Sequence, residues 1–257
     1  MVDVLVCIKR VPDVSGQVAL TADGRSVDVQ HLGHTVSPHE ECAVELAVQV
    51  AAATGGEATV LTVGSADAVA QVRDAVAVGC ASAVLVEADL DAFGPRDVAA
   101  AIAEVVRAHE SQGREYPLVL LGNDAADTGD FQVGVRLAYM LDRPVMTGIA
   151  RCEVDGDMVY AHGDGPDGTE VFEVALPAVV AIQEGGVAPR YPSIPGRMKA
   201  KRTAVDTITP QVQPVGSGRV RLKLPPEKPS SVEVLGEGPE AAPAVVDLLF
   251  RLGVVSR

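Results

Sequence analysis

Three aspartates at three-residue spacing, Asp124, Asp127 and Asp130, follow an apolar run that ends at Gly122. Such spacing raises the question of a metal site, but an EF-hand has its acidic ligands at alternate positions and a Glu at the twelfth. The segment also lacks the G-x-x-x-x-G-K-[ST] spacing of a P-loop, and no G-x-G-x-x-G follows the first apolar run. The residues alone therefore leave two interpretations open, a polar loop that needs glycine for its turns and a loop that binds an anionic nucleotide.

Residues for covalent catalysis form no recognisable pattern. No G-x-S-x-G elbow is present, and the five histidines are scattered. His39 and His162 could each titrate, although an exposed or capping role is the simpler interpretation. The four cysteines lie far apart without a C-x-x-C pair, which predicts neither a zinc site nor a disulfide framework and fits a reducing cytoplasm. We expect no bond-making chemistry and no metal.

A basic segment, residues 188–202, stands out against the acidic background. Three prolines stiffen it, and it carries Tyr191, Ile194 and five cations without an acid. A stiff loop with an apolar tip loses little entropy on docking, so it suits a transient contact with another protein. The alternative is a buried loop anchored by Tyr191.

The first half of the chain alternates short β-branched runs with helical stretches, the pattern of a parallel sheet with crossover helices. We expect strands at 2–8, 58–63, 83–86 and 118–122 and helices at 38–54, 65–79, 94–111 and 131–141. Ser37, Pro38 and Glu40 form a capping box with proline at the first helical position, Ser65 caps the second helix, and Asp23-Gly24 predicts a hairpin within residues 17–29. In such sheets ligands bind at the carboxyl ends of the strands.

The second half changes to hairpins. Runs at 151–154, 158–161 and 171–175 flank glycine-rich turns, and residues 179–182 can rejoin the main sheet. Repeated prolines predict an extended segment from 186 to about 230. An amphipathic helix follows Pro239, with Val245, Leu248, Leu249 and Leu252 on one face. We divide the chain into an α/β domain, residues 1–205, and a C-terminal arm, residues 206–257, which docks on its own domain or on a partner subunit.

Length and charge narrow the functional classes. The chain has 257 residues and a formal net charge of −14, which argues against a phosphate-backbone binder, so nucleic acid is not an expected partner. Its apolar runs are shorter than the ~18 residues of a membrane span, and no signal peptide precedes the first strand, so we expect a soluble cytoplasmic protein without membrane insertion. Aromatic residues make up 3%, so a flat cofactor would find few stacking surfaces on this chain.

Five blocks of the sequence resemble the β subunit of electron-transfer flavoproteins, in order over nearly the whole chain. They are residues 4–13, 118–134, 176–180, 189–195 and 198–201, and the proline-rich block followed by M-K-A-K is the most specific. The resemblance implies a heterodimer with an α subunit, one FAD held mainly by α and an AMP inside β. It implies an electron carrier rather than an enzyme, which accepts electrons from acyl-CoA or related flavin dehydrogenases, as in fatty acid oxidation, and delivers them to a quinone oxidoreductase. The fold implied is a three-layer, parallel-sheet nucleotide-binding fold like that of adenine-nucleotide hydrolases and universal stress proteins, with an added β-hairpin region and an extended C-terminal arm.

The resemblance also implies two sets of site residues. The nucleotide pocket falls on Cys7, Ser37, Pro38, His39, Glu40, Ser65, Gly122, Asn123, Asp124, Ala125, Ala126, Asp127, Thr128, Gly129, Asp130, Phe131, Gln132 and Val133. The partner-recognition loop falls on Arg190, Tyr191, Pro192, Ser193, Ile194, Pro195, Gly196, Arg197, Met198 and Lys199, with Ile194 in the place of an anchoring leucine. Asp164 stands where the family has a Glu that pairs with an arginine of the α subunit.

Departures from the family pattern leave one alternative for the cofactor. Val133 removes a hydroxyl that could bond a phosphate, and electron-bifurcating relatives, which hold a second FAD in this cavity, share the Q-V-G sequence. His39 replaces an aromatic residue that lies against the flavin, and Gly163 replaces an arginine. AMP is the expected ligand and a second FAD the alternative.

Two other classes remain for comparison. A stand-alone adenine-nucleotide sensor of the universal-stress type would show G-x-x-G spacing with a later G-[ST] in the loop that follows Leu121, and that pattern is not visible there. A nucleotide pyrophosphatase would carry S-G-G-x-D-S after the first strand, which is also missing.

Overall fold

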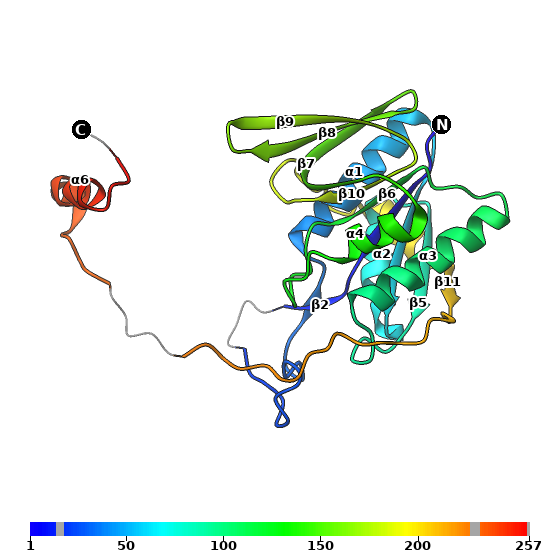
Figure 1. Ribbon diagram of the computed structural model, residues 1–257, viewed down its shortest axis with the longest axis horizontal. Helices are drawn as coiled ribbons and strands as arrows, with labels where there is room; N and C mark the ends of the chain where they lie inside the picture. The colour runs from blue at the N-terminus through cyan, green and yellow to red at the C-terminus, as the bar shows by residue number, and fades with distance from the viewer. Residues whose placement is uncertain (14–17, 227–231, 256–257) are drawn as a thin grey trace. The chain divides into compact units, whose positions relative to one another are not determined.

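The computed structural model describes residues 1–13, 18–226 and 232–255, and the chain divides into two compact units, residues 1–222 and 223–257 (Figure 1). We expected the division after residue 205. The chain instead stays with the first unit as far as Leu222, because residues 205–208 join the main sheet and the residues after them bond to its helices and loops.

A nine-stranded sheet in the order β11-β5-β4-β1-β6-β10-β7-β8-β9 forms the centre of the first unit. The strands from β11 to β7 run parallel to their neighbours, and β7, β8 and β9 are antiparallel. The parallel strands are β1 (Val4–Ile8), β4 (Ala58–Gly64), β5 (Ser82–Glu87), β6 (Leu118–Gly122), β10 (Ala178–Ile182) and β11 (Val205–Ile208). The antiparallel region comprises β7 (Val145–Asp155), β8 (Met158–Gly165) and β9 (Gly168–Ala175), and a separate pair joins β2 (Val11–Pro12) to β3 (His34–Thr35).

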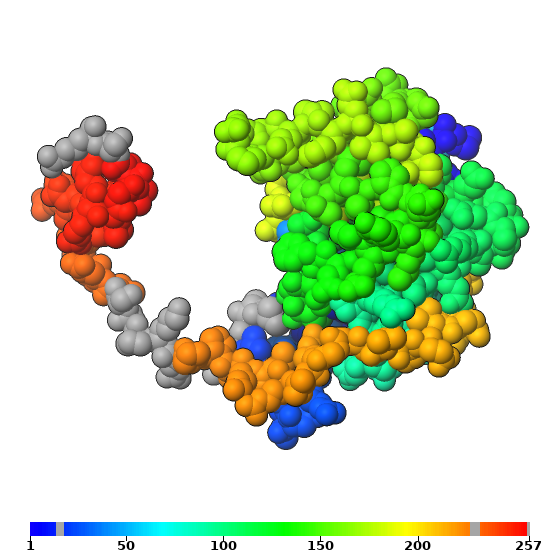
Figure 2. Space-filling model, viewed as in Figure 1, coloured from blue at the N-terminus to red at the C-terminus, as the bar shows by residue number. Residues whose placement is uncertain are grey.

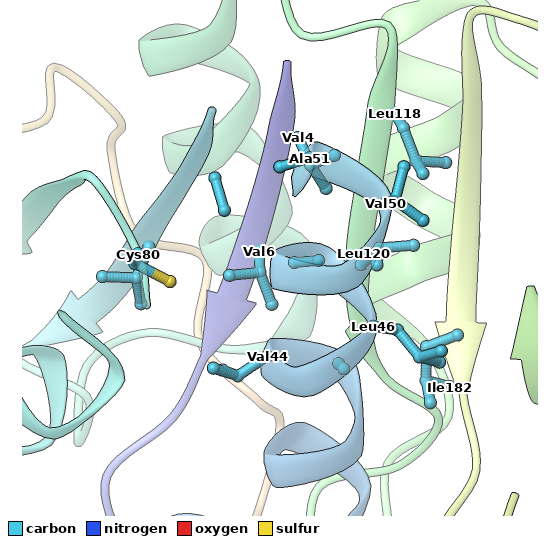
Figure 3. Packing of buried hydrophobic residues seen from close by; sticks show 14 of the residues in the cluster. Val4, Val6, Val44, Leu46, Val50, Ala51, Cys80, Leu118, Leu120 and Ile182 are labelled. Atoms are coloured by element: carbon cyan, nitrogen blue, oxygen red, sulfur yellow. The ribbon is translucent and has the colours of Figure 1, made fainter. Parts of the chain in front are cut away.

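Helices cover both faces of the parallel strands, which confirms the three-layer fold. Helices α1 (Pro38–Thr54), α2 (Val69–Val78) and α5 (Ile194–Arg202) belong to one side, and α3 (Pro95–Ser111) and α4 (Val133–Leu141) belong to the other. Alternate residues of β1 enter the two cores, since Val4 and Val6 lie in one cluster while Leu5 and Cys7 lie in the other. Figure 3 shows α1 packed against these strands, with its apolar side chains beside those of β1, β6 and β10. Burial of both faces explains why the strands read as continuous apolar runs.

The start of α1 follows the predicted capping box. The Ser37 hydroxyl accepts a hydrogen bond from the Glu40 amide at 3.2 Å, and the Glu40 carboxylate accepts one from the Ser37 amide at 3.1 Å. The helix ends at Gly55, whose φ of 73° a side chain would disfavour. This helix therefore has fixed ends, and its first turn lies at the carboxyl edge of the sheet.

The prediction that residues 186 to about 230 form an extended segment is wrong in two places. Ser193 caps α5, Pro195 occupies its first turn, and no proline follows until Pro210, so nothing prevents a helix and then strand β11. Six of the ten residues of the predicted recognition loop, residues 194–199, are consequently the first part of a helix. Gln17, at the start of the predicted hairpin, and residues 227–231 lie outside the described residues.

Three smaller expectations also change. Ser65 precedes a short 3₁₀ helix, η1 (Ala66–Ala68), and its side chain makes no capping bond, so its predicted role as a cap is wrong. Helix α4 begins at Val133 rather than Phe131. The hairpin near Asp23-Gly24 is reduced to a single bridge between Leu20 and Val27.

The C-terminal unit contains η2 (Gly238–Ala241) and the predicted terminal helix α6 (Ala242–Arg251). Val245, Val246 and Leu252 are exposed on this unit. It therefore presents apolar side chains that its own residues do not cover.

Residues 209–222, here called the strap, leave β11 and run along the end of α3. The buried Asp97 carboxylate of α3 accepts hydrogen bonds from the amides of Val215 (3.0 Å) and Gly216 (2.8 Å) as well as from Gly94 (2.9 Å). At its far end the Leu222 amide donates to the Gly24 carbonyl at 2.7 Å. Figure 2 shows the orange strap passing beside the blue segment that contains Gly24. This hydrogen bond therefore links the strap to the segment that contains Gly24.

Asp97→Asn should lower the free energy of unfolding by about 1–3 kcal/mol, since bonds to an ionised acceptor are the stronger ones. Burial alone would raise the pKa of Asp97, but the three amide bonds outweigh it and hold the pKa below its usual value. Stability from this group is therefore present above the unfolded-state pKa and is lost as pH falls through the folded-state pKa. Urea unfolding at pH 7 and at acidic pH measures both effects. The exposed Asp155→Asn serves as the control, and equal effects of the two changes would contradict the assignment.

Candidate functional site

A cavity of about 1280 Å³ lies at the carboxyl ends of β1, β4 and β6. Its walls come from these strands, from the loop after β6, from the start of α3, from residues 21–30 and from the strap. The position agrees with the rule that ligands of open parallel sheets bind at the carboxyl edge. A cavity of this size accommodates a small molecule of nucleotide dimensions.

The lining combines buried apolar side chains with a charged set. The apolar side includes Leu61, Val63, Val98, Ile102 and Leu121. The charged residues that line the cavity are Lys9, Arg25 and Arg219 and the acids Asp23, Asp28, Glu40, Asp91, Asp124, Asp127 and Asp130. An apolar wall with a few polar groups is typical of a site for a flat ring that carries polar substituents.

About half of the predicted nucleotide residues lie on this cavity. Those that line it are Cys7, Glu40, Gly122, Asn123, Asp124, Ala125, Asp127, Thr128, Asp130 and Val133. Those outside its lining are Ser37, Pro38, His39, Ser65, Ala126, Gly129, Phe131 and Gln132. Ser65 and Phe131 are exposed, whereas Ser37 is buried in the capping box.

The loop after β6 is held in shape by its own backbone. The Gly129 amide donates to the Ala125 carbonyl at 2.7 Å, and the Ala125 amide donates to the Asp130 carbonyl at 3.1 Å. Gly129 has a φ of 66°, which a larger residue would adopt with strain. The Asn123 side chain accepts a hydrogen bond from the Gly148 amide at 2.8 Å, which ties the loop to β7. Hydrogen bonds within the chain therefore define the shape of this loop.

Lys9 reaches across the cavity from the end of β1. Its Nζ lies 2.7 Å from Oδ1 of Asp127, and both side chains are partly exposed. The pair links two predicted ligand-binding loops. Sequence reasoning missed Lys9 as a lining residue, although its place directly after the first strand could have indicated it.

His39 sits at the start of α1 between two loops. Its Nδ1 accepts a hydrogen bond from the Glu184 amide at 2.9 Å, which requires that nitrogen to be unprotonated. Its Nε2 lies 2.8 Å from Oδ1 of Asp124, so the imidazole ring links the Glu184 backbone to the Asp124 carboxylate.

Glu40 is a buried carboxyl at the cavity wall. Burial raises its pKa to about 7, and its hydrogen bonds with Ser37 and the nearby Lys9 only partly offset this. The Cys7 thiol beside it has its pKa raised to about 12 by burial first and by Glu40 second, so it stays protonated. Neither group provides the pair of an activated nucleophile and its base.

Glu40→Gln should remove a pH dependence of stability. The folded-state pKa lies above the unfolded-state value, so ionised Glu40 destabilises the fold and stability falls as pH rises from about 4.5 to about 7. The stability advantage of Glu40→Gln over the wild type should therefore grow by about 2–3 kcal/mol between pH 5 and pH 8. Thermal or urea unfolding across this pH range measures it. The exposed Glu57→Gln is the control, and a constant difference between Glu40→Gln and the wild type would contradict the prediction.

The predicted partner-recognition residues form a second site, here called the docking segment, residues 190–199. Tyr191 and Ile194 are exposed, which excludes the alternative of a buried loop anchored by Tyr191. Asp164 lies exposed near the end of β8, opposite Thr169 of β9, and does not line the cavity. Sequence reasoning missed Glu45, which binds Arg190, because nothing in its helical neighbourhood marks it.

Two further findings concern the described residues only. They contain no group of three or more histidine, cysteine, aspartate or glutamate side chains placed to hold a metal ion. In that same part of the chain, no helix is long and apolar enough to cross a membrane.

The fold and the cavity define a three-layer α/β protein with a large cavity at the carboxyl edge of its sheet. The sequence profile of the electron transfer flavoprotein domain matches residues 26–212. The chain belongs to the electron transfer flavoprotein family, whose β subunits carry electrons and do not convert a substrate of their own.

Individual relatives support this assignment. The chain is 35% identical over 221 residues to electron transfer flavoprotein subunit beta of Bacillus subtilis, covering 83% of this chain and 85% of that protein. It is 32% identical over 237 residues to the subunit beta of Syntrophomonas wolfei, covering 91% and 90%. It is also 28% identical over 271 residues to the acryloyl-CoA reductase electron transfer subunit gamma of Anaerotignum propionicum, covering 98% and 99%.

Proposed function

We propose that this chain is the β subunit of a heterodimeric electron-transfer flavoprotein. In this proposal it pairs with an α subunit, shares one FAD held mainly by α, accepts electrons from acyl-CoA or related flavin dehydrogenases and passes them to a quinone oxidoreductase in the cytoplasm. The observation that carries it is the exposed apolar tip of the docking segment, in a family of electron carriers. A carrier needs such a surface for short-lived contacts with its donor.

The proposal assigns roles to residues outside the cavity as well. His39 faces the flavin in place of an aromatic residue, and Asp164 pairs with an arginine of the α subunit. The C-terminal unit, residues 223–257, packs on the α subunit, which would cover the exposed apolar side chains of α6. A chain with only 3% aromatic residues depends on its companion to hold the flavin ring.

We further propose that the cavity holds AMP. The apolar wall suits an adenine ring, and the carboxylates of Asp124, Asp127 and Asp130 can accept hydrogen bonds from ribose hydroxyls or the adenine amino group. Lys9, Arg25 and Arg219 can meet a phosphate. When bound, the nucleotide supplies no chemistry in this proposal and completes the packing of the strand ends.

A second FAD in the cavity is the alternative, which would make the protein an electron-bifurcating type. Val133 favours it, because no hydroxyl stands there to bond a phosphate, and the cavity is large. The charge balance opposes it, because seven acids and three cations line the cavity and each added phosphate increases the repulsion. This balance favours a ligand with one phosphate.

Ligand content tests the cofactor proposal. The two subunits are co-expressed and the heterodimer is purified. It is then denatured by heat, and the released nucleotides are separated and quantified. We expect one AMP and one FAD per heterodimer. Two FAD and no AMP per heterodimer would contradict the AMP proposal and would support the bifurcating arrangement.

Reduction by a donor tests the function. The co-purified pair should be yellow, its flavin should be reduced by a medium-chain acyl-CoA dehydrogenase with octanoyl-CoA, and a quinone oxidoreductase should reoxidise it. A colourless complex that cannot be reconstituted with FAD would overturn the proposal. So would a chain that never associates with an α subunit.

A further inference from the structure

The docking segment presents apolar side chains that the described residues of the chain leave largely or partly uncovered. Tyr191 is 95% exposed, Ile194 81% and Met198 48%. Side chains in this state tend to collapse onto the nearest apolar surface unless the backbone that carries them is fixed. The exposed tip therefore requires attachments on both of its sides.

Helix packing fixes the C-terminal side of the tip. The buried Ala200 of α5 belongs to the same core as α2, and Lys199 donates to the Cys80 carbonyl at 3.5 Å. Gly196 approaches the end of α2 so closely that a Cβ atom there would lie 2.1 Å from the Ala77 carbonyl oxygen. The Ser193 hydroxyl accepts the Gly196 amide at 3.1 Å and caps the helix. From Ser193 onward the segment is well anchored.

One ion pair fixes the N-terminal side. Glu45 of α1 is buried, and its carboxylate accepts Nε of Arg190 at 2.8 Å, Nη2 of Arg190 at 2.7 Å and the Arg190 backbone amide at 3.1 Å. Gln49, one turn later on α1, donates to the same carboxylate at 2.7 Å. The pair lowers the pKa of Glu45 through the bonds from Arg190 and raises the pKa of Arg190. This bidentate pair, here called the fork, fixes the direction of the Arg190 side chain as well as its distance from Glu45, because two parallel bonds restrict rotation.

Because of two nearby prolines, the ion pair between Glu45 and Arg190 is the main polar attachment on the N-terminal side of the tip. Pro189 and Pro192 stand on either side of Arg190 and Tyr191 and have no amide hydrogen, so they can donate no backbone hydrogen bond. Among the described residues from 188 to 192, Arg190 is the one whose hydrogen bonds reach another element of the fold. Loss of the fork would leave Tyr191 and Pro192 tethered only through the chain.

We propose that Glu45 is a positioning residue for partner docking: through Arg190 it holds the exposed apolar tip in the conformation that the donor flavoprotein binds. This inference rests on the proposed function. Glu45 itself contacts neither the partner nor the cofactor. Its effect is preorganisation, which lowers the entropy cost of association and leaves later steps unchanged.

Kinetics of the holo-heterodimer test the proposal. With octanoyl-CoA and a medium-chain acyl-CoA dehydrogenase, Glu45→Gln should raise KM for the heterodimer about 3-fold to 30-fold and leave kcat and flavin content unchanged. Glu41→Gln, an exposed glutamate on the same helix, is the matched control and should change neither constant. A fall in kcat at constant KM, or equal effects of the two variants, would overturn the proposal.

A double-mutant cycle separates positioning from a general loss of stability. If Glu45 acts only by positioning Arg190 and the adjoining Tyr191, its effect on KM should largely disappear in a Tyr191→Ala background, because the side chain that it positions has been removed. A merely structural role would give additive effects. Additivity would therefore contradict the proposal.

Amide hydrogen exchange gives a readout that needs no dehydrogenase. In Glu45→Gln the amide of Arg190 should exchange at least 10-fold faster than in wild type, while those of α5 and of the sheet stay protected. Unchanged exchange at Arg190 would overturn the proposal even if the wild-type heterodimer proved inactive with every dehydrogenase tried. If the wild type were inactive but Glu45→Gln showed the expected faster exchange, the result would count against the proposed function alone.

Discussion

Ile194→Ala is expected to reduce kcat/KM for reduction by the acyl-CoA dehydrogenase about 10-fold to 100-fold, with normal flavin content. The side chain is exposed and stands at the start of α5, where Ser193 caps the helix and the backbone is fixed. A rigid apolar anchor of this kind contributes most when it fills a pocket of the partner. Because the side chain packs on little of its own chain, truncation should leave the fold intact.

Stopped-flow reduction of the heterodimer at several concentrations measures the effect of Ile194→Ala. The control is Val171→Ala, which shortens another exposed apolar side chain, on β9, and should leave kcat/KM within about 2-fold of wild type. Reduction of the flavin by dithionite, which needs no docking, should be equal in all three proteins. Equal rates with the dehydrogenase in Ile194→Ala and wild type would place the docking surface elsewhere.

The parallel core could be predicted from the sequence because each of its signals is local. The apolar runs of β1, β4, β5 and β6 and the capping box at Ser37 need no tertiary information to be recognised. The glycine after α1 marks its end in the same way. Strong local signals therefore placed the carboxyl edge where the cavity is found.

In the docking segment, the number of prolines led to the wrong prediction of an extended chain. Pro195 stands in the first turn of α5, where its missing amide hydrogen has no cost, so it favours a helix rather than an extended chain. Strand β11 forms after the helix because β5 offers it a free edge, which is a tertiary cause. Neither feature follows from the prolines themselves.

The cavity was predicted on one side only. Residues near β1 and β6 were identified, whereas Arg219 of the strap and Phe93 near α3 were not. Arg219 reaches the site because Asp97 holds the strap along α3 through backbone amides, and the sequence around an acceptor does not reveal which distant amides it will bind. The pair of Glu45 and Arg190 escaped prediction for the same reason, since 145 positions separate its partners.

Gly94→Ala should open the cavity and release its nucleotide. A Cβ atom at Gly94 would lie 2.3 Å from the Gly216 carbonyl oxygen and 2.8 Å from the Ser217 amide nitrogen, both of them backbone atoms of the strap. Gly94 has a φ of −101° and a ψ of 178°, which any residue adopts, so the effect comes from the close approach alone. The overlap exceeds what side-chain adjustment can absorb, and the strap has to move away from α3.

The displaced strap removes Ser217, Arg219 and Leu222 from the cavity wall. We expect Gly94→Ala to destabilise the protein by about 1–3 kcal/mol and to reduce the nucleotide retained per purified heterodimer at least about 10-fold after gel filtration. Amides of Val215 and Gly216 should lose their protection from exchange, since their acceptor is Asp97 at the same helix end.

The control for Gly94→Ala is Gly33→Ala. A Cβ atom at Gly33 meets nothing closer than 3.8 Å and its backbone has no left-handed φ, so nucleotide retention should stay at the wild-type level. If Gly94→Ala kept its nucleotide while the strap amides lost protection, the cavity would be closed by residues 21–30 without help from the strap. If the amides also stayed protected, the close contact between Gly94 and Gly216 would be refuted, and with it the role of α3 in holding the strap over the site.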